Sequence, residues 1–106
     1  MGELENKKPV NSRNYAYLRV STKEQTIDRQ MSALMALNID IDERDIYIDK
    51  FSGKTFSDRP YYQALKRSIR RGDTLYIKAL DRFGRNKQEI KEEWKWFMDN
   101  EIYILL

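Results

Sequence analysis

Short apolar segments alternate with amphipathic stretches through the whole chain, and this alternation restricts the fold more than any other feature of the sequence. The short segments are rich in aromatic and aliphatic residues, as β-strands are, and the stretches between them carry apolar residues at helical spacing. Connections of this length suit strand–helix–strand units, which produce parallel strands with right-handed crossovers. The sequence therefore predicts an α/β fold in which a mostly parallel β-sheet carries helices on both faces.

Three complete strands and three helices are expected, followed by the start of a fourth strand. The strands cover residues 15–20, 45–49 and 74–78, and the fourth begins at residue 101. The apolar faces of the helices are expected to consist of Ile27, Met31, Leu34 and Met35 in the first, Tyr61, Leu65 and Ile69 in the second, and Ile90, Trp94, Phe97 and Met98 in the third.

The third helix also carries a run of alternating charges. Such a run is typical of a helix surface in contact with water. Trp96 falls among these charges, where it either packs against the stems of neighbouring side chains or forms a subunit contact. We expect the solvated face to consist of Lys87, Glu89, Lys91, Glu92, Glu93 and Lys95.

The chain contains neither histidine nor cysteine, which excludes several classes of chemistry. It cannot by itself form a Ser–His–Asp or Cys–His catalytic unit. It also cannot form a zinc site with histidine or cysteine ligands, an iron–sulfur cluster or a disulfide. Any reaction must therefore depend on hydroxyls, carboxylates, amines and guanidinium groups.

Charge and hydropathy indicate a soluble, cytoplasmic protein without a membrane partner. The net charge of +3 is too small to indicate a nucleic-acid partner by itself. No apolar run approaches the roughly 18 residues that span a bilayer, and no apolar signal-peptide core lies near the start. Residues 1–13 are polar and contain Pro9, and we expect them to be a flexible tail before a single domain at residues 14–106.

Polar residues capable of phosphate chemistry follow the predicted strands. In parallel sheets, ligands bind beyond the carboxyl ends of the strands. The first strand brings Arg19 and Ser21 to this edge, the second brings Asp49 and a loop that ends in Arg59, and the third brings the basic segment 80–86. Arginine has a rigid fork of donors that matches phosphate oxygens. A hydroxyl with several arginines, and without histidine, favours phosphoryl transfer over acyl transfer.

Three sequence segments at this edge form a distinctive combination. They are YLRVSTKEQ at residues 17–25, DKFSG at residues 49–53 with the DR pair at 58–59, and LDRFGR at residues 80–85. In this order and spacing they resemble the serine site-specific recombinases, the resolvase/invertase family, over residues 14–106. The short interval from the serine to Gln30 is closer to the small resolvases and invertases than to the large integrases.

The resemblance implies a DNA-cleaving enzyme that works through a covalent serine intermediate. The serine would attack a DNA phosphodiester, form a 5′-phosphoserine bond and release a 3′-hydroxyl, with no metal or other cofactor. The partners implied are DNA and, in the full-length protein, further copies in a homodimer or tetramer, with no small-molecule substrate. The roles implied are nucleophile for Ser21, phosphate binding for Arg19, Arg59, Arg82 and Arg85, orientation of the arginines for Asp81, support for Gln25 and Gln30, and a place beside the site for Asp49.

The chain departs from the family pattern at two points. The family often has a lysine late in the second helix, and the corresponding position is Ser68, with Lys66 and Arg67 nearby. Family members also continue into a further strand, a long dimerisation helix and a DNA-reading domain. We therefore expect a resolvase-like catalytic domain that is truncated at its C-terminus. Alone it would be inactive in strand exchange, although the full protein would act in site-specific recombination or transposition.

Several of these residues also have simpler explanations. Ser21 could cap the first helix, and Arg82 could form an ion pair with Asp81 alone. The sequence GKT at residues 53–55 resembles the end of a phosphate-binding loop, but Ile48 stands where that motif needs its first glycine. The alternative function is a non-catalytic module of the same fold that binds nucleic acid or another protein. A third reading is a small phosphate-binding enzyme.

Overall fold

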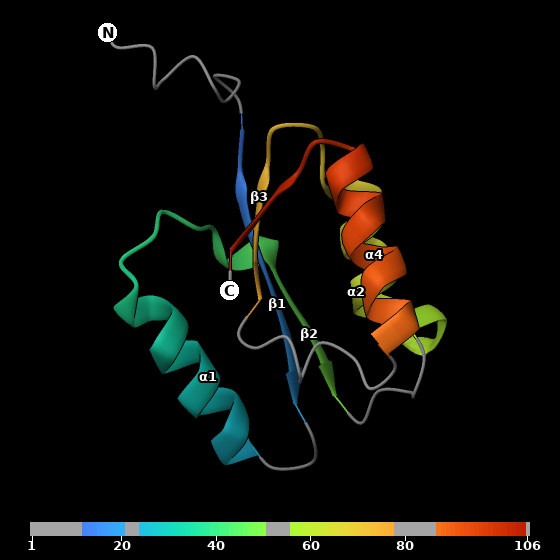
Figure 1. The fold of residues 1–106 in the computed structure, drawn as a ribbon. Helices are drawn as coiled ribbons and strands as arrows, with labels where there is room; N and C mark the ends of the chain where they lie inside the picture. The colour runs from blue at the N-terminus through green and yellow to red at the C-terminus, as the bar shows by residue number, and fades with distance from the viewer. Residues whose placement is uncertain (1–11, 21–23, 51–55, 78–86, 106) are drawn as a thin grey trace, which may run out of the picture.

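The computed structural model describes residues 12–20, 24–50, 56–77 and 87–105, with only the backbone described for residues 24–27 and 57. Its elements alternate between strands and helices along the chain (Figure 1). The strands are β1 (Asn14–Val20), β2 (Ile46–Lys50), β3 (Thr74–Ile77) and β4 (Tyr103–Leu105), the helices are α1 (Glu24–Ala36), α2 (Pro60–Ser68) and α4 (Lys87–Asp99), and two 3-10 turns are η2 (Glu43–Asp45) and η3 (Phe56–Asp58).

The described strands form one sheet in the order β2-β1-β3-β4, and every pairing in it is parallel. Helix α1 lies on one face of this sheet, and α2 and α4 lie on the other (Figure 1). The predicted α/β class, with a parallel sheet between helices, is therefore confirmed. Because the strands run in one direction, β1, β2 and β3 all end at the same edge of the sheet, and this common edge is where the candidate site was expected.

The helices are short, and a proline and a glycine mark the beginning of α2 and the turn that follows it. Helices α1 and α4 have 13 residues each and α2 has nine. Pro60 starts α2 at a position that proline favours. Gly72, with φ of 90°, makes the turn from α2 into β3, a conformation that glycine adopts without steric penalty. In the part of the chain that the structure describes, no helix is long and apolar enough to cross a membrane.

The core lies between the sheet and helices α2 and α4, and it corrects the predicted apolar face of α2. Tyr62, Leu65 and Ile69 are buried in it, whereas Tyr61 is 57% exposed. Both tyrosines have helical spacing to Leu65 and Ile69, so periodicity alone could not choose between them. The choice depends on Asp49, which accepts hydrogen bonds from the first turn of α2 and so fixes its rotation.

Helix α4 also differs from the prediction in detail. Phe97 is fully buried as expected, but Met98 is exposed. Trp96, expected among the solvated charges, instead packs partly buried against the core, with its ring 5.0 Å from that of Phe97. Glu93 is not a solvated charge, because its side chain is largely buried against α2. On the other face of the sheet, α1 buries Leu34 but leaves Met35 exposed.

Candidate functional site

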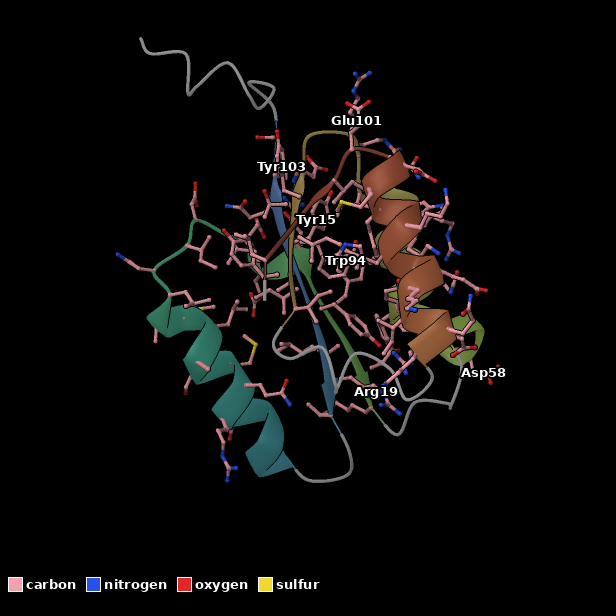
Figure 2. The ribbon with its side chains drawn as sticks, in the orientation of Figure 1. Tyr15, Arg19, Asp58, Trp94, Glu101 and Tyr103 are labelled. Carbon is pink, nitrogen blue, oxygen red and sulfur yellow. The ribbon has the colours of Figure 1, made fainter. Side chains whose placement is uncertain are left out.

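The carboxyl edge of the sheet brings Arg19 and Asp49 next to each other. They occupy paired positions in the register of β1 and β2. Figure 2 shows Arg19 at the opposite end of the sheet from Glu101 and Tyr103, which mark the amino ends of the strands. Arg19 is a half-buried cation in a strand whose other residues are mostly apolar and buried. The two residues occupy the edge at which this fold binds ligands.

Asp49 holds the beginning of helix α2. Its carboxylate is 2% exposed and accepts a hydrogen bond from the Tyr17 hydroxyl, Oη to Oδ2, at 2.8 Å. The backbone N–H of Tyr61 donates to Oδ1 at 3.0 Å, and that of Tyr62 donates to Oδ2 at 3.0 Å. These N–H groups belong to the first turn of α2, whose N-cap residue Arg59 makes no side-chain capping hydrogen bond. Asp49 therefore caps the N-terminus of α2, although it lies in strand β2.

Arg59 is held near the carboxyl edge of the sheet by the contacts between Asp49 and α2. It directly precedes α2, and its side chain is fully buried. Its guanidinium carbon lies 4.3 Å from the centroid of the Phe56 ring, a cation–π contact. Its carbonyl accepts the N–H of Gln63 at 3.0 Å, which links it to the first turn of the helix. A buried guanidinium is costly to desolvate, so this position is more typical of an arginine with a specific task than of a surface charge.

Gln30 supports the end of β1. It lies in α1, is buried, and donates from Nε2 to the carbonyl oxygen of Arg19 at 3.4 Å. Among the predicted site residues, the structure thus describes four and gathers them around the ends of β1 and β2. The remaining predicted site residues lie outside the described part, namely Ser21, Asp81, Arg82, Arg85 and the side chain of Gln25.

Of the three positions named for the family's late lysine in α2, Arg67 is exposed, and Lys66 and Ser68 have other partners in this chain. The Lys66 ammonium donates to Glu93 Oε1 of α4 at 2.8 Å. The Tyr47 hydroxyl donates to Ser68 Oγ at 3.3 Å. Both side chains therefore hold α2 against its neighbours, Lys66 against α4 and Ser68 against β2.

Two tyrosines outside the predicted set of site residues complete the surroundings of the site. Burial, with the hydrogen bond to Asp49, raises the pKa of Tyr17 far above its ordinary value. Burial, with the hydrogen bond to Glu93, likewise raises the pKa of Tyr62. The positive charge of Arg59 opposes both pKa shifts without reversing them. The sequence holds one signal for Tyr17, because it lies two residues before Arg19 and so on the same face of β1.

These pKa shifts predict a loss of stability at alkaline pH. In the unfolded chain the hydroxyls of Tyr17 and Tyr62 ionise with a pKa of about 10. The folded protein holds their protons more tightly, so the stabilisation is complete below pH ~10 and declines as the pH rises further. Urea unfolding measured between pH 8 and pH 11 should show this decline, and Tyr17→Phe or Tyr62→Phe should each make it shallower. Tyr61→Phe, at an exposed position, should leave the slope unchanged; an equal effect of all three variants would contradict the explanation.

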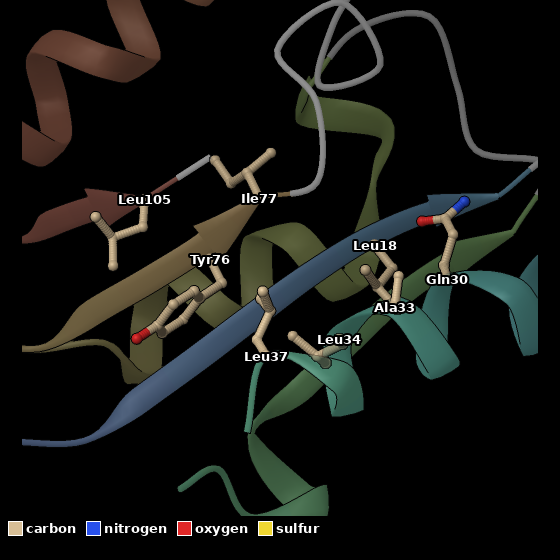
Figure 3. A pocket seen from close by; sticks show the side chains of 8 residues that line it. All are labelled: Leu18, Gln30, Ala33, Leu34, Leu37, Tyr76, Ile77 and Leu105. Carbon is tan, nitrogen blue, oxygen red and sulfur yellow. The ribbon is translucent and has the colours of Figure 1, made fainter. Parts of the chain in front are cut away.

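A separate cavity lies on the other face of the sheet, under α1. It has a volume of about 190 Å³, and Gln30 closes it at the end nearest the carboxyl end of β1 (Figure 3). None of the described residues that line it is charged, so it does not suit a phosphate. Its lining consists of Leu18, Gln30, Ala33, Leu34, Leu37, Tyr76, Ile77 and Leu105.

Comparison with known proteins gives a consistent result. The family model described as "Resolvase, N terminal domain" matches residues 14–106. The chain is 33% identical to Transposon Tn2501 resolvase of Escherichia coli over 94 residues, which cover 88% of this chain and 48% of the relative. It is 39% identical to DNA-invertase hin of Salmonella typhimurium (strain LT2) over 74 residues, 70% of this chain and 36% of the relative. The chain therefore matches about half of each relative's length or less.

Proposed function

Since the chain belongs to the resolvase family of serine recombinases and carries the family's N-terminal domain at residues 14–106, we propose that it cleaves and rejoins DNA through a covalent bond to Ser21. The observation that carries the proposal is the fully buried Arg59, held at the carboxyl edge of the sheet by a helix that Asp49 anchors. Arg19 ends the neighbouring strand at the same edge. We therefore place the phosphodiester at this edge, beside Arg19 and Arg59.

In the proposed reaction, the Ser21 oxygen attacks the phosphorus of a DNA phosphodiester. A bond forms between the serine oxygen and phosphorus, and the bond from phosphorus to the 3′-oxygen breaks. The serine loses its proton and the departing 3′-oxygen gains one, so the step yields a 5′-phosphoserine and a 3′-hydroxyl with no net change in protons. Rejoining is the reverse reaction with a new 3′-hydroxyl. Because the covalent bond conserves the energy of the phosphodiester, no nucleotide cofactor or metal is required.

Arginines supply the electrostatic part of this mechanism. In phosphoryl transfer the protein mainly positions the groups and neutralises the charge on the non-bridging oxygens. We assign this role to Arg19 and Arg59, together with Arg82 and Arg85, and the orientation of the latter pair to Asp81. Gln30 supports the backbone at the end of β1, from which the chain continues to the nucleophile. Gln25 is assigned a similar supporting role.

The proposed setting is site-specific recombination or transposition in the cytoplasm, with DNA as substrate and a homodimer or tetramer as the active assembly. The tail predicted for residues 1–13 would lie outside the catalytic domain except for Arg13, which donates hydrogen bonds to Asp45 and Asp73 at 2.8 Å each. Strand exchange requires a tetramer, so residues 14–106 alone are not expected to carry it out. The competing proposal is a non-catalytic module of the same fold, which would bind DNA without forming a covalent bond to it.

Trapping of the covalent intermediate tests the proposal. The protein expressed from its full reading frame is incubated with a binding site selected from random DNA, nicked so that rejoining is prevented. We expect a protein–DNA adduct whose phosphate maps to Ser21 by mass spectrometry. Ser21→Ala should bind the DNA but form no adduct, whereas Ser32→Ala, at an exposed position on α1, should form it normally. An adduct formed by Ser21→Ala would overturn the assignment, and DNA binding without any adduct would favour the non-catalytic module.

A further inference from the structure

Helices α2 and α4 are joined by a polar contact that we call the α2–α4 junction, made by Tyr62, Lys66 and Glu93. One carboxylate oxygen, Glu93 Oε1, accepts hydrogen bonds from the Tyr62 hydroxyl and from the Lys66 ammonium, the latter at 2.8 Å. The Lys66 and Glu93 side chains are each only 18% exposed. Lys66 Nζ also lies 4.5 Å from the centroid of the Trp96 ring. The junction is therefore a largely desolvated set of hydrogen bonds and one ion pair.

The position of the junction matters because each helix is attached to a segment of the candidate site. Tyr62 lies three residues after Arg59, at the start of α2. Helix α4 begins at Lys87, two residues after Arg85. Glu93 lies six residues along α4, a distance of about 9 Å at 1.5 Å per residue. Because an α-helix is stiff over this length, fixing Glu93 also fixes Lys87, the first residue of α4.

The junction is tied to the same buried cluster that holds Arg59. The Tyr62 ring lies 5.1 Å from the Tyr17 ring and 5.0 Å from the Phe56 ring, on which the Arg59 guanidinium rests. Its backbone N–H donates to Asp49 at 3.0 Å. Tyr62 therefore connects Glu93 of α4, through one side chain, to the residues that hold Arg59. A displacement of α4 would disturb this connection.

We infer that Glu93 is a positioning residue, which fixes the start of α4 relative to Arg59 by binding Tyr62 and Lys66. The inference rests on the proposed function, because it assigns the two arginine-bearing segments to one phosphate. Displacement of a catalytic group by about 1 Å can slow a reaction by up to about a hundredfold. Loss of the junction should therefore slow the attack on phosphate while leaving contacts to the rest of the DNA unchanged.

The geometric part is tested with spin labels, which the absence of natural cysteine makes straightforward. Labels at Arg67→Cys on α2 and Lys91→Cys on α4, both at exposed positions, report the distance between the helices. The unsubstituted junction should give one narrow distance distribution. Glu93→Leu should broaden or shift this distribution. Glu93→Gln should change it less, because the amide oxygen of the glutamine still accepts one hydrogen bond. Glu92→Leu, at an exposed position on the same helix, is the matched control and should change nothing. An unchanged distribution in Glu93→Leu would overturn the inference.

The catalytic part is tested by the rate of adduct formation at saturating DNA, at a temperature where circular dichroism shows each variant to be folded. We expect Glu93→Leu to lower this rate about 10- to 100-fold and Glu93→Gln to lower it less, with the half-saturating DNA concentration changed by less than about twofold. If Glu93→Leu reacts at the unsubstituted rate, the inference fails while the proposed function stands. If Glu93→Leu does not fold, the same criterion applies to Glu93→Gln. If the unsubstituted protein forms no adduct, the proposed function fails and the inference fails with it.

Discussion

Replacement of Arg59 by methionine is expected to lower the rate of covalent adduct formation by about a thousandfold or more. The estimate is the contribution that one arginine makes when it stabilises the charge of a transferring phosphoryl group. Methionine keeps much of the aliphatic stem of Arg59 but removes the guanidinium, which lies over the Phe56 ring. Arg59→Lys restores a positive charge without the planar fork, so it should recover only part of the rate. The measurement is the single-turnover rate with nicked DNA at saturating protein.

The matched control is Arg67→Met, which removes an arginine from the exposed surface of α2. It should leave the rate within a few-fold of the unsubstituted value, because exposed cations contribute mainly to salt-dependent binding. Since Arg59 is buried, the free energy of unfolding must be measured for each variant, and the rates compared where all are folded. A rate for Arg59→Met within about tenfold of the unsubstituted protein would remove Arg59 from the phosphate-binding set.

The sheet could be predicted from the sequence because its determinants are local. The alternation of strand and helix patterns requires parallel strands, and parallel strands place Arg19 and Asp49 at one edge wherever the helices pack. In the structure, Arg19 and Asp49 are paired in the register of β1 and β2, two strands that end at the same edge. Local sequence patterns were therefore sufficient to predict the fold class and the edge of the sheet that carries the candidate site.

The functions of individual polar side chains could not be predicted, because they depend on partners distant in sequence. Asp49 caps a helix that begins 11 residues later, and Glu93 pairs with a lysine 27 residues earlier in the chain. By periodicity Glu93 belongs to a charged surface, and only the packing of α4 against α2 makes it a buried partner. The choice between Tyr61 and Tyr62 likewise depends on the capping contacts of Asp49.

Replacement of Asp49 by alanine is expected to lower the free energy of unfolding by about 3–5 kcal/mol. The substitution leaves three buried or partly buried donors without their acceptor, namely the Tyr17 hydroxyl and the N–H groups of Tyr61 and Tyr62. Each such donor costs about 1–3 kcal/mol, less where water can reach it. A domain of this size has a total stability of only about 5–15 kcal/mol, so the loss is large. Urea unfolding followed by circular dichroism measures it.

Further variants separate capping by Asp49 from a general effect of its charge. Asp49→Asn keeps one acceptor oxygen but loses the charge, so it should cost less, about 1.5–3 kcal/mol. Asp28→Ala, at an exposed position on α1, should change the stability by less than about 0.5 kcal/mol. Tyr17→Phe should destabilise the unsubstituted protein but have a smaller effect in the Asp49→Ala background, because the shared hydrogen bond is already lost. If the effects of Tyr17→Phe and Asp49→Ala were additive, the hydroxyl and the carboxylate would act independently, and Asp49 could not be the link that ties β1 to the helix behind Arg59.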